Sequence, residues 1–137
     1  MTLVIESHSA HETKSWGRRL ASVLEGGELL GLMGDLGAGK TVFIKGLASG
    51  LNLREEDILS PTFTMIQEHR GRMALYHIDL YRLEEAGLDD LGLRESEELE
   101  ALSVRISYVS PSARRIEFVA ASDRYEHLLE RLRSRFA

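Results

Sequence analysis

The spacing of hydrophobic residues predicts an ordered series of elements in the first part of the chain. Residues 3–5 form a short apolar run, as expected of an edge strand. A helix should follow, because Ser9 precedes Glu12 at the capping-box spacing and apolar residues then recur at helical intervals up to Gly26. Residues 29–33 are continuously apolar, which is typical of a strand that is covered on both faces.

The second part of the pattern predicts two hairpins. Residues 63–69 and 73–79 have strand character and are separated by a short polar turn. Residues 102–108 alternate between apolar and polar positions, and a turn at 110–112 separates them from a second strand at 116–119. Both pairs should therefore run antiparallel.

Three further helical stretches complete the expected fold, and one of them carries the acidic residues that follow residue 83. Residues 40–51 have helical spacing and should end near Gly50, and Ser122 should cap a last helix. That helix has one apolar stripe, formed by Tyr125, Leu128, Leu129, Leu132 and Phe136. The series predicts an α/β fold with a mixed β-sheet flanked by helices and with antiparallel hairpins, in a single domain over residues 1–137.

Composition narrows the range of functions. The chain has 137 residues, 43% of them hydrophobic, and no apolar run of the roughly eighteen residues that a membrane span needs. Its first residues lack the basic and apolar regions of a signal peptide, so we expect a cytoplasmic protein. It has no cysteine, which excludes disulfides, thiolate metal sites and a cysteine nucleophile.

The charge is unevenly distributed. The net charge is −5, from 17 basic and 22 acidic residues, whereas a protein that binds nucleic acid unaided is usually basic. Residues 84–100 hold eight of the acidic side chains and one basic side chain, so the remainder carries 16 basic and 14 acidic groups, a net +2. We interpret the acidic run as a solvated helix face or loop in preference to a docking surface for a basic partner.

One motif carries the expected chemistry. The segment Gly34-Asp35-Leu36-Gly37-Ala38-Gly39-Lys40-Thr41 matches the P-loop pattern G-x-x-x-x-G-K-T, directly after an apolar strand and at the start of an apolar helix. In such a loop, glycines let backbone N–H groups face phosphate oxygens, and the helix N-terminus adds positive charge. Lys40 should contact the β- and γ-phosphates, Thr41 should bind Mg²⁺, and Val42 should complete the nucleotide-binding segment.

Two residues outside the loop are candidates for catalysis alongside Lys40. Asp79 ends an expected strand, where a P-loop hydrolase needs a carboxylate to hold the shell of Mg²⁺. The alternative is that Asp79 only caps a helix beginning at Leu80. Thr62 follows Ser60-Pro61 and offers a hydroxyl near the γ-phosphate, from a loop that nucleotide state would order.

Three segments together resemble the bacterial ATPase family required for threonylcarbamoyladenosine formation on tRNA, the TsaE type. These segments are Gly34–Thr41, Ser60-Pro61-Thr62-Phe63-Thr64 and Tyr76-His77-Ile78-Asp79-Leu80-Tyr81-Arg82-Leu83. The resemblance implies binding of ATP or ADP and Mg²⁺, with slow ATP hydrolysis. It also implies action with TsaB-type and TsaD-type partners, which modify the adenosine next to anticodons that read codons beginning with A. Contact with tRNA would then be indirect, through the complex.

The chain departs from the family in one region. After Gly87–Glu95 the family has a buried strand ending in Glu-Trp and a proline-rich loop, and neither occurs between about 95 and 102 here. Either the printed sequence omits a segment of the protein, which we favour, or the segment is deleted. Losing a central parallel strand would leave backbone groups unpaired. No residue present inherits the role of the family's glutamate.

The sequence leaves alternatives for the residues that contact adenine and for the reaction that the protein catalyses. The resemblance makes the segment Ala10-His11-Glu12-Thr13 and the Ala113-Arg114 turn candidates for contacting the base, with His11 and Arg114 as the side chains concerned. A capping box and a plain hairpin turn explain these segments nearly as well. A small P-loop kinase acting on a metabolite would need a mobile lid with several arginines, of which the chain offers only the Arg114–Arg115 pair. A nucleotide-sensing module with little turnover is the third possibility.

Overall fold

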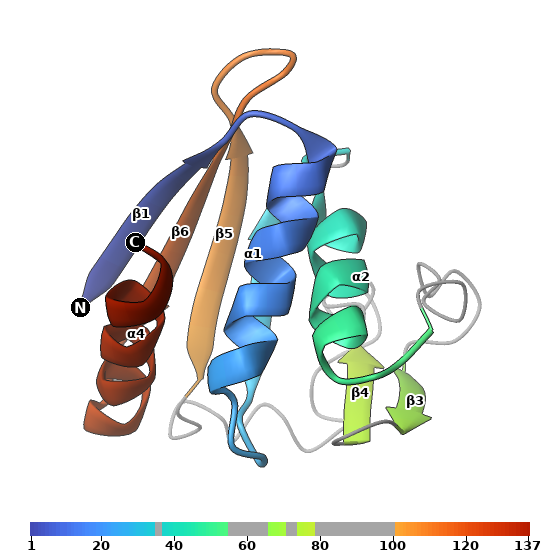
Figure 1. The fold of residues 1–137 in the computed structure, drawn as a ribbon, viewed down its shortest axis with the longest axis vertical. Helices are drawn as coiled ribbons and strands as arrows, with labels where there is room; N and C mark the ends of the chain where they lie inside the picture. Colours follow the sequence, from blue (N-terminus) through green and yellow to red (C-terminus); the bar gives the residue numbers. More distant parts are fainter. Residues whose placement is uncertain (35–36, 55–65, 71–73, 79–100) are drawn as a thin grey trace, which may run out of the picture.

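The computed structural model describes residues 1–34, 37–54, 66–70, 74–78 and 101–137. Within them the chain forms a two-layer α/β structure, in which helices cover one face of a four-stranded sheet (Figure 1). The strands are β1 (Thr2–Ser7), β2 (Leu30–Gly34), β3 (Ile66–Arg70), β4 (Ala74–Ile78), β5 (Leu102–Tyr108) and β6 (Arg114–Ala120). The helices are α1 (Ala10–Val23), α2 (Lys40–Gly50) and α4 (Asp123–Phe136). The expected α/β class with a mixed sheet and antiparallel hairpins is confirmed.

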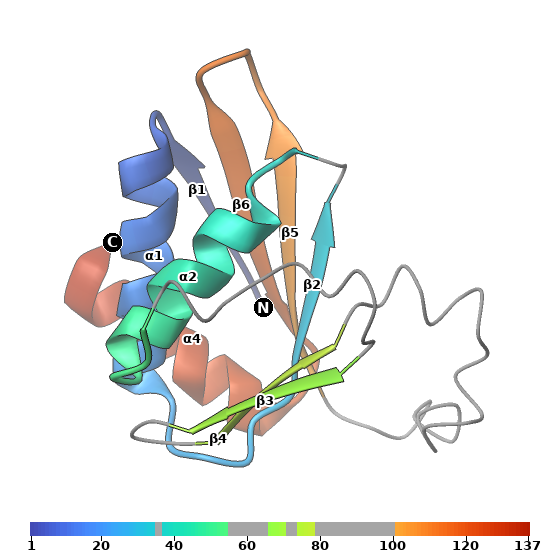
Figure 2. The same ribbon diagram turned by 90° about the vertical axis from the view of Figure 1, so that its right-hand side faces the viewer.

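The four-stranded sheet has the order β1-β6-β5-β2. β1 lies at one edge, as expected, and pairs antiparallel with β6. β5 and β6 form the expected hairpin, but β6 begins at Arg114, two residues before the expected start. It does so because ladder pairing continues to the turn, where Tyr108 is opposite Arg114. β2 runs parallel to β5, which places the C-terminal ends of both strands together (Figure 2).

β2 is less covered than its apolar sequence predicts. Leu30 and Leu32 pack against the helical core, but each is only partly buried. Met33 points to the opposite face of the sheet and is 39% exposed. Among the described elements the helices lie on one face only, so the expectation that both faces of this strand are covered was wrong for Met33.

α1 begins with the predicted cap. The Ser9 side chain accepts a hydrogen bond from the backbone N–H of Glu12 at 3.1 Å. The Glu12 carboxylate in turn accepts from the N–H of His8 at 2.6 Å, one residue earlier than in a standard capping box. The helix ends at Val23, before the two glycines expected to stop it.

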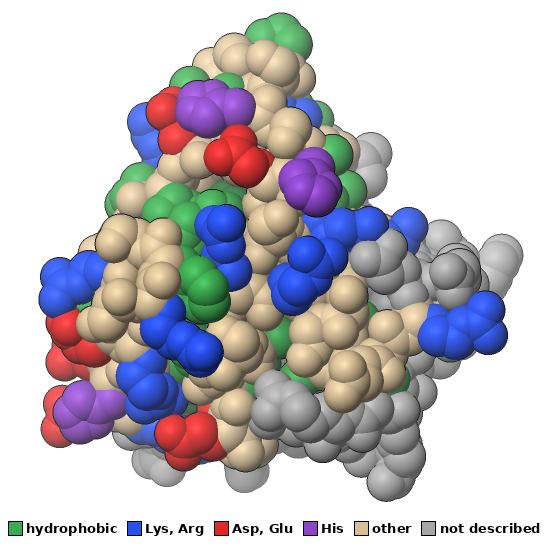
Figure 3. All heavy atoms as spheres, in the orientation of Figure 1, with side chains coloured by type: hydrophobic (Ala, Val, Ile, Leu, Met, Phe, Trp, Pro, Cys, Tyr) green, Lys and Arg blue, Asp and Glu red, His purple; other side chains and the backbone are tan. Residues whose placement is uncertain are grey.

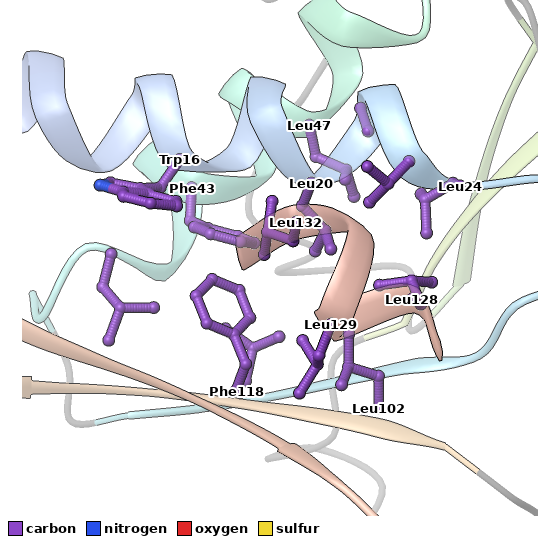
Figure 4. Packing of buried hydrophobic residues seen from close by; sticks show 14 of the residues in the cluster. Trp16, Leu20, Leu24, Phe43, Leu47, Leu102, Phe118, Leu128, Leu129 and Leu132 are labelled. Carbon is purple, nitrogen blue, oxygen red and sulfur yellow. The ribbon is translucent and has the colours of Figure 1, made fainter. Parts of the chain in front are cut away.

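The hydrophobic core joins all three helices to the sheet (Figure 4). Phe118 of β6 is at its centre, with ring centroids 6.5 Å from Trp16 of α1 and 6.2 Å from Phe43 of α2. Leu128, Leu129 and Leu132 close the core from α4, and all three are fully buried. Because α2 packs into this core, the position of its N-terminus, where the preceding loop ends, is fixed.

α1 and α2 cross in direct backbone contact at two glycines. A Cβ at Gly46 would lie 1.9 Å from the carbonyl oxygen of Lys14, and one at Gly17 would lie 2.1 Å from the carbonyl oxygen of Phe43. Real Cβ atoms are not found at such distances from backbone, so only glycine fits at these positions.

α4 differs from its prediction in two details. Ser122 is the N-cap residue but makes no side-chain capping bond, and its buried Oγ has no hydrogen-bond partner among the described residues. Phe136, expected in the apolar stripe, is 37% exposed and lies beside the guanidinium groups of Arg19 and Arg135. The helix therefore has four core residues from the expected stripe rather than five.

The predicted hairpin in the middle of the chain is present as β3 and β4, which pair antiparallel in a sheet of their own. The expected strand residues 63–65, 73 and 79 lie outside the described residues, as does the acidic run at 84–100. On the face formed by α1, α2 and α4, lysine and arginine side chains lie among fewer acidic ones (Figure 3). None of the described helices is long and apolar enough to cross a membrane.

Candidate functional site

The glycine-rich loop lies where the motif requires, between the end of β2 at Gly34 and the start of α2 at Lys40. Gly37 has φ +81° and Gly39 has φ +112°, which are conformations that L-residues with side chains rarely adopt. Gly39 is also the N-cap of α2, with no side chain to satisfy the first N–H groups of the helix. A helix N-terminus without a side-chain cap is suited to binding an anion.

The loop rests on the sheet and on the start of α1. A Cβ at Gly34 would lie 2.6 Å from the carbonyl oxygen of Ile106, so β2 and β5 approach closely here. On the other side, a Cβ at Gly39 would lie 3.6 Å from the methyl group of Thr13. Thr13 is 2% exposed and shares a 2.7 Å hydrogen bond with the hydroxyl of Ser7. This buried pair joins the first turn of α1 to the end of β1, beside Gly39.

The β5–β6 hairpin contacts the loop through two side chains. The Arg114 guanidinium donates from Nε to the carbonyl oxygen of Ala38 at 3.1 Å. Its carbon lies 4.0 Å from the centre of the Tyr108 ring, and a Cβ at Gly37 would lie 3.0 Å from the Tyr108 hydroxyl oxygen. The hairpin therefore touches two consecutive loop residues.

The start of α2 presents the functional groups of the motif. Lys40 is the first residue of the helix, with its Cγ 3.5 Å from where a Cβ of Gly34 would be, so its stem lies across the base of the loop. Thr41 and Val42 follow in the first turn and are partly buried. Chemically, this arrangement offers backbone N–H donors, one ammonium group and one hydroxyl at a helix N-terminus, which suits a phosphate chain with a hard metal ion.

The structure brings together some of the predicted residues only. At the end of β2 and the start of α2 it places Gly34, Gly37, Ala38, Gly39, Lys40, Thr41 and Val42, with Arg114 beside Ala38. His11 lies exposed in the first turn of α1, the same turn from which Thr13 approaches Gly39. Asp35, Leu36, Thr62 and Asp79 lie outside the described residues, although β4 ends at Ile78, immediately before Asp79. The metal-binding role of Thr41 and Asp79 stays a prediction.

Sequence reasoning missed Tyr108, and it included Thr13 only in the segment expected to contact the base, not as a neighbour of the loop. Tyr108 had a usable signal, because it continues the inward-facing row Leu102, Val104 and Ile106 of β5 beyond the last core residue. Thr13 had a weaker one, as a β-branched polar residue on the apolar face of a helix.

A groove of about 430 Å³ lies away from this site. It is formed by the C-terminal end of α1 and the last turns of α4, at the other end of α1 from Thr13. Arg131 bridges it through a 3.1 Å ion pair with Glu25. Its lining has no glycine-rich loop and no helix N-terminus, so we assign the functional site to the loop and not to the groove.

Comparison with known proteins gives one consistent result. A family model described as "Threonylcarbamoyl adenosine biosynthesis protein TsaE" matches residues 7–125. The chain is 40% identical over 140 residues to the tRNA threonylcarbamoyladenosine biosynthesis protein TsaE of Bacillus subtilis, covering 88% of this chain and 87% of that protein. It is 51% identical over 84 residues to the protein of that name from Treponema pallidum, covering 61% and 60%.

A solved structure supports the same conclusion. The crystal structure of YdiB from Bacillus subtilis superimposes with a TM-score of 0.79 and 34% sequence identity, over 98% of this chain and 95% of that chain. The extent of the sequence matches varies, since the match spans less than two thirds of the Treponema pallidum protein but most of the Bacillus subtilis one.

Proposed function

We propose that this chain, which belongs to the TsaE family of threonylcarbamoyl adenosine biosynthesis proteins, binds Mg²⁺–ATP at Gly34–Thr41. It hydrolyses the ATP slowly, and this hydrolysis supports tRNA modification. The observation that carries the proposal is the loop itself. An unbroken P-loop sequence adopts positive φ at Gly37 and Gly39 and leads directly into the N-terminus of α2. A chance glycine-rich turn would not be expected to combine these features.

Each part of the site has a role in this proposal. Backbone N–H groups from Gly37 to Lys40 bind the phosphate oxygens, and the N-terminus of α2 adds partial positive charge. The Lys40 ammonium would contact the β- and γ-phosphates, Thr41 and Asp79 would hold the metal ion, and Thr62 would contribute a hydroxyl for the γ-phosphate. When bound, Mg²⁺ neutralises part of the phosphate charge. The site has oxygen and nitrogen groups only, as a hard cation and a polyphosphate require.

The proposal extends to partners. A single small domain, which we take residues 1–137 to be, has room for one nucleotide site, so hydrolysis is useful chiefly if the two nucleotide states present different surfaces to another protein. We assign that role to TsaB-type and TsaD-type proteins in the cytoplasm, with tRNA contacted through the complex. The relatives named for threonylcarbamoyladenosine biosynthesis support this assignment.

Calorimetric titration with Mg²⁺–ATP tests the site. Lys40→Ala removes a charge-assisted phosphate contact worth about 1.5–3 kcal/mol, so ATP affinity should fall at least about tenfold. Lys45→Ala, further along the same helix, removes an equal charge and should bind as the parent protein does. Equal affinities of the parent and Lys40→Ala would contradict the assignment of the phosphate site.

A further inference from the structure

A carbonyl of the glycine-rich loop is bound by a residue distant in the sequence. Ala38 is fully buried, so its backbone oxygen needs a partner inside the protein. That partner is Nε of Arg114, 76 positions further along the chain, at 3.1 Å. In a trans peptide the carbonyl and the following N–H point in opposite directions. Holding the Ala38 oxygen toward β6 therefore directs the N–H of Gly39 to the other side of the loop.

The same guanidinium is fixed by the hairpin. Its Nη1 lies 3.1, 3.2 and 3.1 Å from the carbonyl oxygens of Ser110, Pro111 and Ala113. Its planar group stacks on the Tyr108 ring at 4.0 Å, and Tyr108 and Arg114 are cross-strand partners in the last pair of the β5–β6 ladder. The Tyr108 ring covers one face of the guanidinium and the hairpin carbonyls bind one edge, so the group has little freedom to rotate. Nε is therefore a donor in a fixed position.

We infer that Arg114 and Tyr108 act as positioning residues, which hold the Ala38–Gly39 peptide in the orientation that binds phosphate. The inference rests on the proposed nucleotide site and goes beyond it, because it gives Arg114 a role through the backbone of the loop and makes Tyr108 part of the site. Glycines at 37 and 39 permit the required φ values but also permit others. The hairpin supplies the restraint that these glycines lack.

Backbone ¹⁵N relaxation on the nucleotide-free chain tests the restraint directly. The order parameters of Gly37 and Gly39 should be near the rigid value of about 0.85 in the parent protein and below about 0.6 in Arg114→Ala. Arg115→Ala is the matched control, because it removes the same charge from the neighbouring position on the opposite, exposed side of β6. Unchanged order parameters in Arg114→Ala would overturn the inference.

Affinity measurements separate positioning from direct contact. In Arg114→Ala, affinities for Mg²⁺–ATP and for Mg²⁺–tripolyphosphate should fall by the same factor, at least about tenfold. If only the affinity for ATP fell, the Arg114 side chain would contact the base. If neither affinity fell, the orientation of the Ala38–Gly39 peptide would not affect phosphate binding. Either result would overturn the inference.

Conservative variants complete the test. Arg114→Lys keeps the charge but cannot serve Ala38 and three hairpin carbonyls together, so it should remain several-fold weaker than the parent. Tyr108→Leu removes the ring beneath the Arg114 guanidinium and should loosen the loop. If Arg114→Ala does not fold, Tyr108→Leu carries the test. If the parent binds no ATP, the proposed function fails, and the relaxation result alone decides whether the hairpin restrains the loop.

Discussion

Ser9 and Ser122 precede α1 and α4 at equivalent positions but differ in what their hydroxyls do. Ser9 accepts from Glu12 N–H at 3.1 Å, whereas the buried Ser122 hydroxyl has no partner among the described residues. Ser9→Ala should therefore lower the free energy of unfolding by about 1 kcal/mol. Ser122→Ala should leave it unchanged or raise it, because it removes an unsatisfied polar atom. Urea unfolding of the two variants measures the difference, and equal losses would contradict the assignment of the caps.

Asp79 has two possible roles, and one substitution separates them. Asn caps a helix about as well as Asp does, but its neutral amide holds the water shell of a metal ion less strongly. In Asp79→Asn we expect ATP binding to persist and the hydrolysis rate to fall, as measured by phosphate release under saturating ATP. Hydrolysis at the normal rate would show that Asp79 is only a helix cap.

The residues of the loop could be predicted from sequence because each is specified locally. The glycines, Lys40 and Thr41 have fixed spacing within one short segment, and the structure has the strand and the helix on either side of it. Tyr108 and Thr13 contact the same loop from β5 and α1, far from it in the sequence. Contacts of that kind depend on how elements pack, and spacing within a segment carries no information about them.

Gly46 gives a stability prediction at the scale of elements. Alanine is favoured over glycine in a helix by about 1 kcal/mol, but here its Cβ would lie 1.9 Å from the Lys14 carbonyl oxygen. Gly46→Ala should force α1 and α2 apart and lower the free energy of unfolding by about 3 kcal/mol.

Gly31 is the control for this effect. No atom lies within 4 Å of a Cβ at that position, and its φ is not positive. Gly31→Ala should be neutral or raise the free energy of unfolding by up to about 1 kcal/mol in the same urea titration. If both variants were equally stable, α1 and α2 would not cross as closely as the structure shows.

The elements were predictable to different degrees, for physical reasons. α1, α2, the β5–β6 hairpin and α4 have clear periodicity, and all four are present close to the expected bounds. The start of β6 was missed because Arg114 and Arg115 are charged, although their backbone groups continue the ladder. The incomplete cover of β2 was missed because an apolar run does not show how many faces are covered.

At the scale of the whole molecule, the described strands form two sheets. β2 pairs with β5 on one side, and β3 and β4 pair only with each other in the described part of the chain. The family resemblance predicts a further strand from a segment that the sequence lacks between about 95 and 102. In the described part of the chain no strand joins the β3–β4 pair to the four-stranded sheet.

The proposed nucleotide-dependent switch makes a prediction about association with the partner proteins. ATP should strengthen association with the TsaB- and TsaD-type pair, and Thr62→Ala should weaken this dependence more than it weakens ATP binding. Light scattering with ATP, with ADP and without nucleotide measures the effect. Equal association under all three conditions would exclude a nucleotide-dependent switch.

The central claim is that nucleotide bound at Gly34–Thr41 serves threonylcarbamoyladenosine formation. The most direct test is a reconstituted reaction with the cognate TsaB- and TsaD-type proteins and tRNA, in which the modified nucleoside is quantified by mass spectrometry. We predict sustained formation with the parent protein and with Lys45→Ala, and little formation with Lys40→Ala or without this chain. Unimpaired modification in the absence of the chain would contradict the account.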